Sequence, residues 1–188
     1  MDKDLHQTAA DAARIMNYKK HAEQLSVPVL KGFERKDDGN PLTILLAEGY
    51  GFTEQLTSDG HIESDQFEQH VDLAINNTKQ FMLNNGCENV DGSFIYHKDY
   101  KSESFQFKLY FCDMIAQVGG ERKIIRQLIA YFFEPKMRDF YQLTLSVGPF
   151  SMPTEKLKPG VIDLQNDQVT ATLDKMMTTL MDNIQYRQ

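Results

Sequence analysis

This sequence has little cysteine, no long apolar run and no amino-terminal signal pattern. Its two cysteines, Cys87 and Cys112, are too few for a disulfide scaffold and are typical of a protein from a reducing compartment. No apolar run approaches the roughly 20 residues needed to span a bilayer. The first residues have neither the basic region nor the apolar region of a secretory signal, although a signal already removed would leave no trace. We therefore expect a cytoplasmic protein without a membrane span.

Positive charge is also scarce. The 188 residues contain 20 Lys and Arg against 27 Asp and Glu, which gives a formal net charge of -7. Phosphate groups bind where a protein presents a positive field, so a nucleic acid is not the expected partner. Arg122, Lys123 and Arg126, with Lys136 and Arg138 further on, form a local basic stretch, but Glu121, Glu134 and Asp139 interrupt it. This stretch is predicted to be the solvated edge of a sheet.

Apolar residues are abundant enough to build a core, since they make up 41% of the chain and include 12 Phe and 8 Tyr. The clearest pattern is the alternation of apolar and polar residues over 105–111, which indicates a strand with one buried face. The segment 124–133 could also begin a helix, but its aromatic run and its place between two strand patterns favour a strand. Five strands are predicted in all, over 42–47, 94–97, 105–114, 124–133 and 140–147.

Helical periodicity appears on both sides of the predicted sheet. Apolar residues recur at helical spacing over 64–84 and again over 166–185. Residues 4–24 contain no Gly or Pro and also favour a helix, but their apolar stripe is thin. This third helix is expected to dock at the periphery.

These patterns together predict an α+β fold. An antiparallel sheet of about five strands would be covered by two long amphipathic helices, with the amino-terminal helix at the periphery. The predicted organisation is an amino-terminal helix and polar linker over residues 1–40, followed by a single α+β domain over residues 41–188.

No group of residues matches a catalytic, metal or cofactor motif. His61 and Glu63 have the His-x-Glu form of zinc deaminases, but the Pro-Cys-x-x-Cys partner is missing. A nucleophilic pair of a cysteine with His97 is disfavoured, because Cys112 lies in an apolar strand and Cys87 follows a helix end, where the dipole raises a thiol pKa. We therefore predict no catalytic residue, no metal and no cofactor.

The expected function is that of a non-enzymatic accessory protein, such as a chaperone, adaptor or inhibitor, that binds another protein or a second copy of itself. The methionines of the last helix either fill the core, which is the default, or offer an adaptable partner surface. The predicted contact residues are Tyr50, Phe52, Met177 and Met181.

The alternative hypothesis is a small-ligand-binding domain or a small hydrolase. In that case, the aromatic residues of the sheet would line a pocket. The predicted pocket residues are Tyr96, His97, Tyr110 and Tyr131.

Overall fold

The computed structural model describes residues 12–17, 25–30, 33–35, 42–45, 51–61, 64–134 and 138–186. The prediction of an α+β fold built on an antiparallel sheet is confirmed. The helices are α2 (Phe67–Asn84) and α3 (Gln168–Asn183), with 3-10 turns η3 (Ser64–Gln66) and η4 (Val90–Gly92). The strands are β1 (Ala12–Asn17), β2 (Leu25–Leu30), β3 (Glu34–Arg35), β4 (Leu42–Leu45), β5 (Gly51–His61), β6 (Phe94–Lys101), β7 (Gln106–Val118), β8 (Glu121–Glu134), β9 (Asp139–Ser151) and β10 (Gln185–Tyr186).

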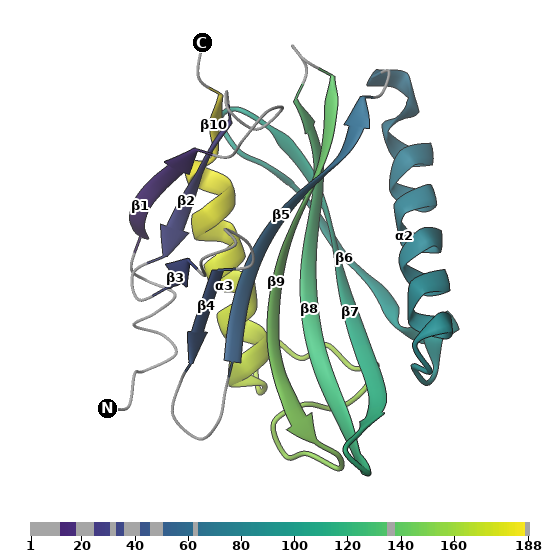
Figure 1. The fold of residues 1–188 in the computed structure, drawn as a ribbon. Helices are drawn as coiled ribbons and strands as arrows, with labels where there is room; N and C mark the ends of the chain where they lie inside the picture. The colour runs from purple at the N-terminus through teal and green to yellow at the C-terminus, as the bar shows by residue number, and fades with distance from the viewer. Residues whose placement is uncertain are drawn as a thin grey trace.

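The main sheet has seven strands in the order β3-β4-β5-β9-β8-β7-β6, and every neighbouring pair is antiparallel. It is larger than the five strands expected. Figure 1 shows the long, twisted strands β5, β9, β8 and β7 at its centre. The ambiguous segment 124–133 lies wholly within β8 and is a strand, not a helix.

Alternation along β7 and β8 produces the two faces of this sheet. Phe107, Leu109 and Phe111 are buried on the face that carries the larger apolar cluster, and that face is covered by α3. The hairpin between the two strands turns at Gly119 and Gly120, both with positive φ. The core therefore arises from the pattern that was read from the sequence.

Strand β5 was not predicted, and its side chains explain why. Phe52 and Leu56 face the core, but Glu54 occupies the inward position between them. A charged residue at an inward position breaks the alternation by which a half-buried strand is recognised. Pairing with β9 over most of its length nevertheless places β5 inside the sheet.

The amino-terminal segment is part of the fold, which corrects the prediction of a helix over residues 4–24. Residues 12–17 form strand β1, which pairs with β2, and β10 completes a three-stranded sheet; the rest of the predicted helix lies outside the described residues. Helix propensity is a weak prior that tertiary pairing overrides. Buried residues of β2, within the predicted segment 1–40, belong to the same core as α3.

The two helices cover opposite faces of the main sheet (Figure 1). Helix α3 contacts β8 and β9 as well as β2, so it lies between the main sheet and the small one. Helix α2 buries Val71, Ile75 and Met82 against a second, smaller apolar cluster. No helix within the described residues is long and apolar enough to cross a membrane.

Substitution of Gly148 tests the close packing of β9 on β8. Its φ is +129°, and an added Cβ would lie 2.9 Å from the carbonyl oxygen of Ile124. We expect Gly148→Ala to lower the free energy of unfolding by about 2–4 kcal/mol, through backbone strain and steric clash. The control Gly119→Ala shares a positive φ but meets open space, so its cost should be about 1 kcal/mol. If urea unfolding gave the same loss of unfolding free energy for both variants, this packing would be contradicted.

Candidate functional site

The candidate site is the segment between β9 and α3, residues 152–167, which we call the anchored loop. It contains no helix or strand, yet buried residues hold it at several points. Ordered connections longer than about 12–15 residues are uncommon in compact domains and are usually functional. The contacts that hold this loop therefore decide what the loop can do.

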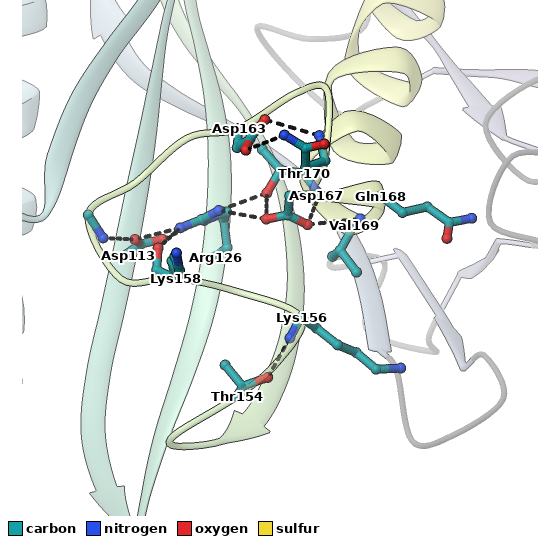
Figure 2. A network of polar contacts seen from close by, with 12 residues as sticks. Asp113, Arg126, Thr154, Lys156, Lys158, Asp163, Asp167, Gln168, Val169 and Thr170 are labelled. Atoms are coloured by element: carbon teal, nitrogen blue, oxygen red, sulfur yellow. Dashed lines mark hydrogen bonds and ion pairs between the residues drawn. The ribbon is translucent and has the colours of Figure 1, made fainter.

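The main anchor is Arg126, which is fully buried on β8. Its Nε and Nη2 donate to the two carboxylate oxygens of Asp113 on β7, at 2.8 and 2.9 Å. Nη2 also donates to the Lys158 carbonyl at 2.8 Å, and Nη1 donates to Thr170 at 2.7 Å and Asp167 at 3.3 Å. These are five bonds for the five N–H donors of a guanidinium. Figure 2 shows Arg126 between Asp113 and the start of α3.

Two carboxylates share this one cation, and backbone amides balance the remaining negative charge. Asp167 is the N-cap of α3 and accepts from the N–H groups of Val169 and Thr170, both at 3.1 Å. Asp113 accepts from the N–H of Gly160 at 2.9 Å. The helix dipole also favours negative charge at this end of α3. Arg126 is therefore a structural clamp with no donor left for a ligand.

Further contacts hold the loop along its length. Leu157 is 1% exposed and belongs to the main apolar cluster, with Ile162 packed against it. The side chain of Asp163 accepts from the backbone N–H groups of Gln165 and Asn166, at 3.1 and 3.0 Å. Hydrogen bonds from the Asn166 side chain and backbone lower the pKa of Asp163, which favours the ionised form of this half-buried carboxylate. These contacts hold the loop in one conformation on the surface of the domain.

What the loop exposes is a mixture of apolar and charged groups. Val161 is 50% exposed and Leu164 is 38% exposed, although both are large apolar residues. A cavity of about 430 Å³ lies against the loop and the start of α3, and Lys156 and Lys158 are among its lining residues. Rigid loops with such exposed groups are typical binding elements.

Arg126 was not identified from the sequence, and its assignment to a solvated basic edge is wrong, because the side chain is fully buried. A signal was nevertheless present. Arg126 takes an inward position on β8 between Ile124 and Leu128, and its partner across the ladder, Asp113, takes an inward position on β7. Opposite charges at inward positions of neighbouring strands predict a buried ion pair. The contributions of Asp167 and the loop had no comparable signal.

The predicted contact residues are not gathered on one exposed surface. Met177 and Met181 are fully buried and fill the core between α3 and the sheet, as methionine commonly does. Phe52 is also fully buried, on β5. Tyr50 lies outside the described residues.

The residues of the predicted aromatic pocket divide between the two faces of the sheet. Tyr96, Tyr110 and Tyr131 form a row on the α2 face, with ring centroids 5.5 and 6.2 Å apart. His97 follows Tyr96 on the same strand, so it points to the opposite face, where its ring meets Phe111 at 4.9 Å. Tyr96 is 52% exposed while Tyr131 is fully buried, so the row runs from surface to core.

His97 instead connects the edge strand to α3. Its Nε2 lies 2.6 Å from the carboxylate of Asp174. The same carboxylate forms an ion pair with the ammonium of Lys98 at 3.3 Å. Burial alone would raise the pKa of Asp174, but the hydrogen bond from His97 and the charge of Lys98 outweigh it and lower the pKa. Tyr100 continues this connection through its hydroxyl, which donates to Asp182 at 2.6 Å. These contacts account for His97 without a catalytic role.

Burial disfavours the reactive thiolate form of both cysteines. Burial raises the pKa of Cys112 to about 12 and also raises the pKa of Cys87. Among the described residues, no group of three or more His, Cys, Asp or Glu side chains could hold a metal ion.

A second exposed apolar area lies on α2. Leu73 and Phe81 are 52% and 59% exposed, and they border a groove of about 570 Å³. Thr57 of β5 and Gln142 of β9 line its other side. Unlike the anchored loop, this area is the outer surface of a regular helix.

Comparison of the sequence with protein-family models gives no match, and comparison with curated proteins gives no significant relative. The functional argument therefore rests on the geometry of the chain itself.

The buried ion pair can be tested by Arg126→Met. This substitution leaves the carboxylates of Asp113 and Asp167 without their cation, and we expect the free energy of unfolding to fall by about 3–5 kcal/mol. The control is Arg122→Met, which breaks the exposed ion pair with Glu88 and should cost at most about 1 kcal/mol. Urea unfolding measures both. A cost for Arg126→Met as small as that of the control would contradict the clamp.

Proposed function

We propose that this chain is a non-enzymatic accessory protein that binds another protein through the anchored loop. The observation that carries the proposal is a long irregular segment that a buried guanidinium holds in place while Val161 and Leu164 stay exposed. A protein of adaptor or inhibitor type needs such a surface and no reactive group.

Pre-organisation is the physical reason why this loop suits binding. Ordering a flexible loop upon association costs conformational entropy, which weakens the complex. Here Arg126, Asp113 and Asp167 order the loop in the free protein. The contacts made by its exposed residues then contribute to affinity without that cost.

The chemistry of the loop favours a protein partner with a mixed surface. Two exposed apolar side chains can provide a desolvated centre, and Lys158 of the neighbouring cavity can pair with acidic groups at the rim. Asp163 and Asp167 already accept hydrogen bonds from the loop and α3, so they add little to recognition.

Strand addition at the sheet edge is a less suitable mode of binding. Strand β6 is the long edge strand, but it carries Lys98, Asp99 and Lys101 and has a register shift between Tyr96 and Lys98. Charged residues and bulges on an edge strand oppose pairing with another chain. This argues for a side-chain surface over edge-to-edge association with a second copy.

A small-ligand-binding domain is the second candidate function. The cavity of about 430 Å³ beside the anchored loop is within the usual size of small-molecule sites. Its lining is rich in charged residues, however, whereas such sites are mostly apolar. Protein binding is therefore the function that the geometry supports better.

The proposal predicts that the double substitution Val161→Ser and Leu164→Ser removes binding but not folding. Both residues are exposed, so each substitution should change the free energy of unfolding by no more than about 0.5 kcal/mol. We expect affinity for a partner captured by the full chain to fall at least about tenfold, the effect of losing one hot spot. Titration calorimetry with the isolated partner measures the change.

Leu73→Ser is the matched control, because Leu73 is similarly exposed but lies on α2. It should leave affinity unchanged. If only the α2 variant lost binding, the interface would lie on the helix and not on the anchored loop. The absence of any specific partner, together with a small molecule that raises the melting temperature of the wild type, would favour the second candidate.

A further inference from the structure

Glu54 is a buried carboxyl group that neither the fold nor the proposed function explains. It lies in the middle of β5 and is 0% exposed. Neither carboxylate oxygen has a hydrogen-bond partner among the described residues. Buried polar groups are nearly always paired, so each unpaired one in a native protein calls for a physical reason.

The described side chains around Glu54 are apolar. Phe52 and Leu56 flank it on the same face of β5, and Leu145 of β9 lies opposite it in the ladder. On the other side, Leu42 of β4 is in register with it. An ionised carboxylate in such a place would be very unfavourable, whereas the neutral acid costs only its unmade hydrogen bonds.

Among the residues that the structure describes, no charge on the neighbouring elements compensates Glu54. Strand β4 contains only Leu42, Thr43, Ile44 and Leu45. Asp139 and Tyr141 are the titratable residues at inward positions of β9, and Asp139 is in register with His61 at the far end of β5. The larger cluster also includes α3 and β2, and the sequence of β2 has no charged residue. On α3, Asp174 and Asp182 bond to residues of β6, Lys175 is exposed, and Asp167 with Arg126 belongs to the saturated clamp.

We propose that Glu54 holds a proton while the sheet is closed, and that release of this proton opens the sheet between β4 and β5, so that the chain contains a pH-sensitive switch. Opening at β4 is the easier route for water. Strand β4 has four residues and its outer neighbour β3 has two, whereas β5 pairs with β9 over most of its length. Short elements at a sheet edge open locally at a lower free energy than central strands.

The sign of the pH dependence follows from burial. Burial raises the pKa of Glu54 from 4.5 to about 8, so the folded chain keeps a proton that the unfolded chain releases. The contribution of Glu54 to stability is therefore greatest below pH 4.5, falls as the pH rises toward about 8, and is constant above that. Over this window, one proton difference changes the unfolding constant roughly tenfold per pH unit.

The first test measures the proton directly. In the full chain, carbon-13 NMR of the glutamate carboxyl groups should show one signal that titrates near pH 8 and is missing in Glu54→Gln. Titration of Glu54 in the range of an ordinary glutamate would overturn the proposal. Glu103→Gln, at an exposed position, is the matched control and should remove only an ordinary signal.

The second test measures the consequence for folding. Urea unfolding of the wild type and Glu54→Gln from about pH 5 to pH 9 should give a ratio of unfolding constants that rises with pH and then levels off. Glu54→Leu, which places an apolar side chain among apolar neighbours, provides the same comparison if the amide variant does not fold. Parallel pH profiles for wild type and variants would overturn the proposal.

The third test locates the opening. At pH 9, limited proteolysis should cut the wild type within β4 or β5, while Glu54→Leu at the same pH should stay intact there. Using the variant as a control at one pH removes the effect of pH on the protease. Resistance of the wild type at pH 9, or equal cutting of both chains, would overturn the switch.

Discussion

The structure depends above all on the ion pair between Arg126 and Asp113, because this pair joins elements that are distant in sequence. Arg126 connects two central strands to the start of α3 and to the backbone of the anchored loop. A buried ion pair is weak evidence for net stability when compared with apolar residues, but losing one partner is costly. Its clearer role here is geometric, since all five donors of one side chain fix the positions of three separate segments.

Two of the buried acidic residues of the sheet, Asp113 and Glu54, have opposite surroundings. Asp113 accepts from a guanidinium and a backbone amide, so its charge is compensated inside the fold. Glu54 has no such donors in the described part of the chain, so burial favours its protonated form. The main sheet thus combines a permanent clamp near α3 with a group at its β4 side whose charge depends on pH.

Much of the sheet was predictable because β7, β8 and β9 follow the period-two pattern of a half-buried strand. Strand β5 was not, because Glu54 occupies one of its core positions. Strand β1 was read as a helix, since only pairing with β2 determines its conformation. The clamp could not be predicted from local patterns alone, because its residues come from β7, β8, the loop and α3.

The central claim is that the anchored loop is rigid in the free protein because buried groups hold it. Nitrogen-15 relaxation of the backbone amides over residues 152–167 tests this most directly. We predict order parameters near 0.85, the value of rigid backbone, and equal to those of β7, β8 and β9. Values below about 0.6 across the loop, with rigid strands beside it, would contradict the account.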